Sequence, residues 1–298
     1  MGPTLTGLAI GFLVLGVALW PLERLFPALP HQPLLRKGFT TDLAYWAFTP
    51  LVTRGLTRAG VVVAVVVLAA AAGVPLDRTH VQAFLASPGA LVQRQPMALQ
   101  VIEVLVLGDL VGYWTHRLFH HQSTLWRFHA VHHGSTALDW LSAVRLHPVN
   151  DVVSRVAGVV PVLLLGFSPG ILAGYVPFLT LYAIVLHANV TWSFGPLRYV
   201  LASPTFHRWH HTSEAEGLDR NFAGLFPVFD LVFGTFYMPP GRGPQRFGLA
   251  RETVPEGLLA QLAYPFRAQP RGRQGQAQLT PDRLGFTDSS ATSRSAAP

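Results

Sequence analysis

The chain has 298 residues, of which 50% are apolar and only 12% are charged, whereas soluble domains usually carry roughly 25% charged residues. Its 22 Lys and Arg outnumber its 15 Asp and Glu and give a net charge of +7. So few charges on so apolar a chain argue against a disordered protein, a nucleic-acid-binding protein and an ordinary soluble enzyme, and they favour a membrane protein.

Two apolar segments near the start of the chain are predicted to be membrane helices. Residues 5–20 carry no charge, and no small-residue cleavage site follows them, so a membrane helix is favoured over a signal peptide. Residues 59–73 are also uncharged but are short for the about 20 residues that span a bilayer. This second helix is therefore expected to extend back into 43–58, where Arg54 and Arg58 can reach an interface.

The middle of the chain predicts further membrane helices. Residues 97–115 form the third, and its acids Glu103 and Asp109 should face protein or a site, because acids at membrane depth are costly. Residues 156–186 predict a helical hairpin, since Pro and Gly within 166–170 indicate a tight turn. The expected fold is an all-α integral membrane bundle of four or five membrane helices with a His-rich helical cap.

The positive charges indicate how this bundle is oriented. Most Lys and Arg lie in 21–42, in 116–155 and after residue 187, whereas the opposite side of the membrane would hold only Arg78 and Arg94. The basic side is expected to be cytoplasmic, in the cell's inner or plasma membrane, with the His-rich cap on that face. The last thirty residues are rich in Gln, Gly, Arg, Ser and Ala and predict a disordered tail.

Histidine carries most of the functional information. Because the chain has no Cys, disulfides, thiolate metal sites and a Cys nucleophile are excluded, and a metal site has to use imidazole and carboxylate. Three compact clusters contain His116 and His120; His129, His132 and His133; and His207, His210 and His211. Residues at i, i+3 and i+4 share one face of a helix, so each cluster can aim two or three imidazoles at one point. All three clusters, with His187 at a predicted helix end, would meet at one membrane face.

The number of histidines exceeds the needs of one metal ion, and two metals fit the count. Neutral imidazole suits iron, zinc, copper and nickel. His31 and His80 lie outside the pattern, and His121 points about 100° away from its neighbour His120 on a helix, so it is predicted not to be a ligand. His147 stays open between a helix-start residue, a residue that supports a ligand, and a ligand.

From about Asp109 to Met238 the chain resembles the sterol desaturase / fatty acid hydroxylase superfamily, whose members are membrane-bound non-haem di-iron oxygenases. The motifs that carry the resemblance are Asp109-Leu-Val-Gly-Tyr-Trp-Thr-His116-Arg117, Trp126-Arg127-Phe128-His129-Ala-Val-His132-His133, Arg145-Leu-His147-Pro148, His187-Ala-Asn189, Phe206-His207-Arg208-Trp-His210-His211, Asp219-Arg-Asn221-Phe-Ala-Gly224 and Phe229-Asp230. The resemblance implies two iron ions, O2 as co-substrate, and nine ligands: His116, His120, His129, His132, His133, His187, His207, His210 and His211.

The implied activity is hydroxylation or desaturation of a lipid, such as a sterol or a fatty acyl chain. No His-Pro-Gly-Gly motif of a cytochrome b5 domain occurs, so a separate electron donor of cytochrome b5, ferredoxin or reductase type is expected. The chain is accordingly divided into membrane helices (1–96), a di-iron catalytic domain (97–240) and a C-terminal extension that is largely tail (241–298). Its expected partners are the lipid, the electron donor and the membrane, with no role for nucleic acid.

Several further residues are candidates for the site. Carboxylates should orient the imidazoles by accepting the outer ring N–H, and Asp109, two helical turns before His116, and Asp219 are the leading candidates, with Asp139 and Asp230 behind them. Asn189 is expected either to support His187 or to cap its helix. The aromatic residues that could line a substrate site, or else anchor at the membrane interface, are Tyr113, Trp126, Trp140, Trp192 and Trp209.

Two other functions are weighed against the oxygenase. A His-rich membrane metal transporter would place its ligands along a transmembrane path, whereas these histidines concentrate at one face. A zinc-dependent membrane hydrolase would need a compact site with an acid–base Glu, as in His-Glu-x-x-His, and the sequence contains no such motif.

Overall fold

The computed structural model describes residues 5–86 and 92–267, and within these ranges it forms helices and loops, two isolated β-bridges and no strand. The helices are α1 (Leu5–Leu25), α2 (Phe39–Phe48), η1 (Thr49–Thr53), α3 (Arg54–Ala71), α4 (Arg78–Ala86), α6 (Met97–His121), α7 (Ser123–His133), η2 (Trp140–Val144), α8 (Pro148–Leu164), α9 (Pro169–His187), η3 (Gly195–Tyr199), α10 (Pro204–His210), η4 (Ala215–Gly217), α11 (Val228–Val232), α12 (Leu258–Ala263) and η5 (Tyr264–Phe266). The predicted disordered tail lies outside the described residues.

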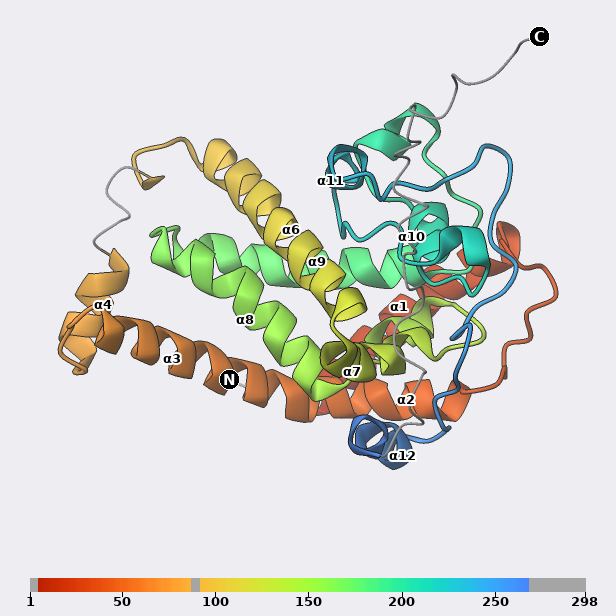
Figure 1. Ribbon diagram of the computed structural model, residues 1–298, viewed down its shortest axis with the longest axis horizontal. Helices are drawn as coiled ribbons and strands as arrows, with labels where there is room; N and C mark the ends of the chain where they lie inside the picture. The colour runs from red at the N-terminus through yellow and green to blue at the C-terminus, as the bar shows by residue number, and fades with distance from the viewer. Residues whose placement is uncertain (1–4, 87–91, 268–298) are drawn as a thin grey trace, which may run out of the picture.

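Four helical stretches of the described chain are long and apolar enough to cross a membrane: Leu5–Leu25, Phe39–Ala71, Met97–His121 and Gly170–His187. They confirm the predicted all-α membrane bundle. The hairpin is also present, since α8 and α9 follow one another across Gly166, whose φ of 79° suits glycine. In Figure 1, α3, α6, α8 and α9 extend together to the left of the view, whereas α7, α10 and α11 lie to the right.

The second membrane stretch is longer than its uncharged part, as the sequence predicts. α2 continues through the π-helical turn η1 directly into α3, so the stretch covers Phe39–Ala71 without a break. Pro50 lies in η1, where its ring lacks an N–H and cannot make the ordinary helical hydrogen bond. Arg54 and Arg58 therefore lie within the helix, on its exposed side.

Three helices that carry or precede histidines begin with the same local signal. α8, α9 and α10 each have Pro as the first helical residue, directly after a side chain that caps the helix. Ser203, for example, accepts a hydrogen bond from the backbone N–H of Phe206, 3.2 Å away. Pro at this position sacrifices no intrahelical hydrogen bond, so the helix starts are fixed by sequence.

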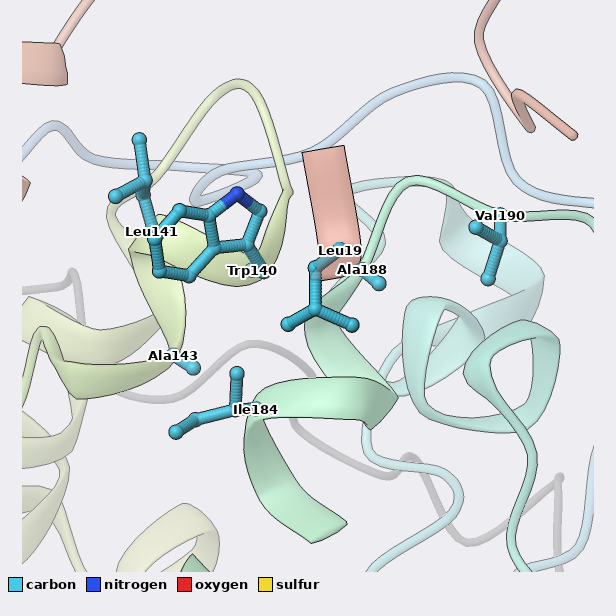
Figure 2. Packing of buried hydrophobic residues seen from close by; sticks show 7 residues of the cluster. All are labelled: Leu19, Trp140, Leu141, Ala143, Ile184, Ala188 and Val190. Atoms are coloured by element: carbon cyan, nitrogen blue, oxygen red, sulfur yellow. The ribbon is translucent and has the colours of Figure 1, made fainter. Parts of the chain in front are cut away.

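The core beside the histidines joins α1, η2 and the end of α9. Figure 2 shows the buried apolar cluster that they share, which consists of Leu19, Trp140, Leu141, Ala143, Ile184, Ala188 and Val190. Glu23, near the end of α1, accepts hydrogen bonds from the backbone N–H groups of Trp140 and Asn189 at 3.0 and 2.9 Å. The first membrane helix is thereby attached to the two loops that follow α7 and α9.

A buried ionic network connects the start of α2 to the loop after α7. Asp42 is fully buried and bonds Arg145 Nε at 2.5 Å and Arg36 Nη1 at 2.7 Å. Arg36 also pairs with Asp139. Buried charges in this arrangement require one another, because each would be costly alone. Asp139 caps η2 as well, so this candidate orienting carboxylate serves the loop and not an imidazole.

Candidate metal centre

The nine histidines that the resemblance implies as ligands lie together in the structure and form two groups. The first histidine group contains His116, His120, His129, His133 and His210, and the second contains His132, His187, His207 and His211. Within each group, one ring nitrogen from every histidine lies within 4.8 Å of all the others. The groups adjoin, because the stacked rings of His133 and His211 have centroids 4.4 Å apart.

Four elements aim these side chains. His116 and His120 come from the last two turns of α6, and His187 ends α9. α7 contributes three of the remaining six, and α10 with its C-cap residue His211 contributes the other three, each set with the i, i+3, i+4 spacing that the sequence displays. The ends of two long helices and the faces of two short ones therefore converge, which explains why residues 95 positions apart in the chain share one site.

In the first histidine group, four rings are held from outside by a hydrogen-bond acceptor. The Nδ1 atoms of His116 and His210 donate to the backbone carbonyls of Phe222 and Arg220 at 2.8 Å each. The other two rings donate through Nδ1 to side chains: His120 to Asp219 at 3.0 Å and His129 to Asn150 at 2.6 Å. A carbonyl or carboxylate only accepts, so these four Nδ1 atoms carry the proton and each Nε2 keeps its lone pair.

The second histidine group repeats this arrangement on two of its members. His132 Nδ1 donates to the carbonyl of Arg145 at 3.1 Å, and His187 Nδ1 donates to the carbonyl of Ala183 at 2.7 Å. Their Nε2 atoms then face each other at 3.3 Å with no proton between them. His116 and His129 present the same juxtaposition in the first group, at 3.0 Å.

Facing lone pairs repel one another unless a cation lies between them, so both groups have the chemistry of metal sites. The buried Nε2 atoms of His120 and His210 support this reading, because neither has a hydrogen-bond partner among the described residues. The two groups together offer nine imidazoles and no thiolate or carboxylate donor. This set of donors fits divalent metals of the iron-to-zinc series.

Burial keeps these imidazoles neutral. It lowers the pKa values of the six histidines on α7 and α10 well below the ordinary value, and neighbouring imidazoles lower them further; the six are His129, His132, His133, His207, His210 and His211. A neutral imidazole is the form that binds a metal, so no deprotonation is needed near pH 7.

One short segment, 219–222, orients three imidazoles of the first group. It supplies the Asp219 carboxylate to His120 and two backbone carbonyls to His210 and His116. Asp219 and Asn221 have left-handed backbone conformations, with φ of 53° and 58°. The Asn221 side chain stabilises its own conformation by bonding Phe206 and Tyr237.

Asp109 has a different role from the predicted one. Its carboxylate does not orient His116 but accepts three backbone N–H groups, from Gly224, Leu225 and Phe226, at 2.7–2.9 Å. It therefore fixes the chain just after the 219–222 segment. Asp230 acts on the same loop, since it accepts the backbone N–H groups of Phe222 and Ala223.

Two polar candidates lie next to the centre without joining it. Asn189 neither supports His187 nor caps its helix; its side chain bonds the backbone of Leu29 through both amide atoms. His147 caps α8 by accepting the Val149 N–H and lies outside both histidine groups. His121 is exposed and also lies outside them.

The aromatic candidates pack into the interior. Trp126 is the one that contacts imidazoles, with ring centroids 5.1 Å from His120 and 5.5 Å from His133. Tyr113 and Trp209 are fully buried and hydrogen-bonded, while Trp140 and Trp192 belong to the apolar cluster of Figure 2 or pack against it. A substrate-lining role for these five remains a prediction.

Comparison with known proteins agrees with this geometry. The family model described as fatty acid hydroxylase matches residues 101–235, which include all nine grouped histidines. Residues 101–235 belong to the fatty acid hydroxylase family. No solved structure matches the chain.

Three relatives of the chain have names that state the compounds on which they act. An ornithine lipid hydroxylase of Rhizobium tropici is 33% identical over 176 residues, covering 59% of this chain and 53% of the relative. The alkylglycerol monooxygenase of Danio rerio is 34% identical over 128 residues, which cover 43% of this chain and 28% of the relative. A very-long-chain aldehyde decarbonylase of Oryza sativa is 31% identical over 139 residues, 43% of this chain and 21% of the relative. The chain thus spans about half or less of the length of these relatives.

Asn150, whose role the sequence leaves open, holds His129 from outside. Asn150 is buried at the start of α8, and its Oδ1 lies 2.6 Å from His129 Nδ1. The available signal was its position two residues after Pro148 of the Arg-Leu-His-Pro motif. An amide oxygen accepts a hydrogen bond as a carboxylate does, without adding a buried charge.

Replacing Asn150 by Ala is expected to lower metal affinity or turnover about 10- to 100-fold, the usual effect of losing a side chain that orients a metal-bound histidine. Metal titration of the purified protein measures the change. Ser154→Ala is the control, because Ser154 touches Asn150 only through a long 3.4 Å hydrogen bond. Equal metal affinity in Asn150→Ala and wild type would show that Asn150 does not position His129.

Proposed function

We propose that this chain is a membrane-bound, O2-dependent enzyme that hydroxylates a lipid, with one iron ion in each histidine group. The observation that carries the proposal is the pair of adjoining, buried, imidazole-only groups whose unprotonated Nε2 atoms face inward. An iron pair held there would supply O2 activation and removal of hydrogen from an unactivated C–H bond, which side-chain acids and bases cannot achieve.

The chain's own residues would hold the metals, orient the ligands and exclude water. The outer hydrogen bonds fix the tautomer and the direction of six rings, as the geometry above requires. Burial of eight of the nine histidines excludes bulk water from the ligand atoms. Dryness matters because a reactive oxidant in contact with water is lost to side reactions.

A lipid substrate is supported by the relatives and by the setting. The named relatives include an ornithine lipid hydroxylase and an alkylglycerol monooxygenase, so we assign the substrate to the class of membrane lipids. The apolar helices would let such a lipid approach from within the bilayer. We further propose that the histidine groups face the cytoplasm, where a separate redox protein of cytochrome b5, ferredoxin or reductase type delivers electrons.

The alternative functions fit the geometry less well. A transporter needs ligands spaced along a path, whereas the nine histidines form two adjoining groups at one end of the long helices. A zinc hydrolase needs a carboxylate acid–base beside the metal, and each group consists of histidines alone. Desaturation uses the same type of centre and is distinguished from hydroxylation by its product.

The proposal is tested by expressing the chain and comparing the lipids of the host membranes with those of an empty-vector host. We expect a lipid that has gained one oxygen atom and whose formation requires O2 and a reductant. A product that has lost two hydrogens instead would establish desaturation. A lipid change that persists without O2 would overturn the proposal.

A further inference from the structure

A cavity lined by polar and apolar residues lies beside α10, the helix that carries His207 and His210. Its volume is about 280 Å³, and it is lined by residues of three segments that are distant in sequence: Ala28, 191–208 and 238–245. Three arginines, Arg198, Arg208 and Arg242, line it together with the hydroxyl side chains of Thr191, Ser193 and Thr205. No acidic side chain is among its lining residues. Its size suits a head group better than a whole lipid.

Helix α10 links this cavity to the metal centre. Thr205 and Arg208 are three residues apart and so share the face that lines the cavity. His207 and His210 point about 100° and 160° away from Arg208 around this helix, because each residue advances about 100°, and His211 follows as its C-cap residue. One short helix therefore contributes to both sites and fixes their relative position.

Arg208 is the residue that indicates a ligand. Its side chain is 1% exposed, yet Nε and Nη2 have no hydrogen-bond partner among the described residues. Its Nη1 donates to the carbonyl of Leu138 at 3.1 Å, and its guanidinium lies 4.6 Å from the ring centre of Phe247. A guanidinium group keeps its positive charge in proteins at neutral pH. A buried, charged group with unused donors is costly unless an anion completes it.

The other two arginines, Arg242 and Arg198, differ in whether a carboxylate pairs with them. Arg242 is already paired with Glu214 at 3.0 Å and Glu216 at 2.6 Å. Arg198 bonds the Tyr199 hydroxyl, while its buried Nε has no partner within the described part of the chain. Arg198 and Arg208 thus have no carboxylate hydrogen-bonded to them among the described residues, although the buried carboxylates of Glu23 and Asp139 act on Arg208 electrostatically. The unused N–H donors of the two arginines favour an anion in the cavity.

The surroundings of the cavity indicate that this anion belongs to a lipid. Ala28 follows the end of α1, the first membrane-crossing helix, by three residues. Leu197 and Val200, on either side of Arg198, expose 58% and 54% of their surfaces, and Phe26 exposes 48%. The backbone carbonyl of Phe26 accepts a hydrogen bond from the backbone N–H of Thr191, which lines the cavity. Arginines bordered by exposed apolar side chains are suited to a membrane surface, where a phosphate or carboxylate head group and its acyl chains would both be accommodated.

We propose that this cavity binds the anionic head group, phosphate or carboxylate, of a membrane lipid, with Arg208 and Arg198 as the principal contacts. Identification of that lipid as the substrate rests on the proposed function, but the binding site itself does not. Held there, the head group would be anchored beside α10, and the distance along the lipid from head group to metals would select the carbon that reacts.

Native mass spectrometry of the detergent-purified chain, without O2 or reductant, tests this site. The probes are dioleoyl phosphatidate, oleate, dioleoyl phosphatidylcholine and inorganic phosphate. Phosphatidate or oleate should bind more tightly than phosphatidylcholine or inorganic phosphate. Arg208→Met and Arg198→Gln should each weaken that binding by about tenfold or more, as loss of a buried charged contact does. Arg246→Gln is the control, because Arg246 is exposed and does not line the cavity.

Anionic-lipid affinity that is unchanged in Arg198→Gln and Arg208→Met would overturn the inference. Inorganic phosphate binding as tightly as phosphatidate would also overturn it, because the site would then recognise a free ion. If Arg208→Met does not fold, Arg198→Gln at the less buried edge decides. Selective lipid binding by a chain without oxygenase activity would uphold the site while removing the proposed function.

Discussion

Replacing His120 or His132 by Ala, one from each histidine group, is expected to lower lipid hydroxylation by more than about 100-fold. Removing a residue that only hydrogen-bonds a metal ligand lowers activity by up to about 100-fold. Removing the ligand itself should lower activity further. Each variant should still insert in the membrane, because the removed imidazoles contact other histidines and leave the long helices unchanged. Product formation in membranes, normalised to the amount of protein, measures the effect.

His121→Ala is the matched control for this pair. His121 follows His120 directly on α6, but it is exposed and belongs to neither group. Its replacement should leave turnover and iron content near those of the wild type. Activity retained in His120→Ala or His132→Ala would remove that residue from the ligand set, and an equal loss in His121→Ala would show that the assay reports damage to α6 and not loss of a ligand.

Replacing Asp42 by Ala is expected to destabilise the fold by about 3–5 kcal/mol, the typical effect of removing one partner from a buried ionic network. Asp42 bonds both Arg36 and Arg145, and both guanidinium groups are buried. Arg36 would keep Asp139, whereas Arg145 would lose the one acidic partner recorded for it within the described residues. Denaturant-induced unfolding in detergent measures the loss.

The same variant should also disturb the second histidine group, because the carbonyl of Arg145 holds His132. Glu256→Ala is the control: its pairing with Lys37 at 3.4 Å is solvent-exposed, and such pairs contribute about 0–1 kcal/mol. A wild-type unfolding midpoint in Asp42→Ala would show that the network does not stabilise the fold.

The histidine positions could be predicted because the signal is local. Spacing of three and four residues places imidazoles on one helix face, and the nine histidines singled out from the sequence are the nine that the structure brings together. How they divide between two groups could not be predicted. His132 and His133 are consecutive yet belong to different groups, since neighbours on a helix point about 100° apart.

The prediction for Asp109 was wrong because the same local reasoning was carried too far. Asp109 does lie two helical turns before His116 on α6, but its carboxylate is taken by backbone N–H groups at 224–226, more than a hundred residues later. The periodicity of a helix cannot predict a contact with a segment so distant in the sequence. Asp219, which lies 99 residues from its partner His120 in the sequence, does bond an imidazole.

The supporting role of the N-terminal region was also invisible in the sequence. Residues 1–96 were interpreted as membrane helices alone, yet Glu23, Arg36 and Asp42 bond the loops that follow α7 and α9. These contacts join residues more than 100 positions apart, so only the packed structure reveals them. Residues 241–267 also contact earlier helices, through hydrogen bonds between Gly257 and Thr41 and between Trp126 and Glu252. The division of the chain into three domains remains a prediction.

Metal analysis of the detergent-purified chain, expressed with ample iron, tests the central claim most directly. Two adjoining imidazole groups predict two iron ions per chain in the wild type, and fewer in His120→Ala and His132→Ala. Mössbauer spectroscopy of the same sample should show the two irons as a coupled pair. Binding of zinc alone after iron-rich expression, or of a single metal ion shared by all nine histidines, would contradict the account.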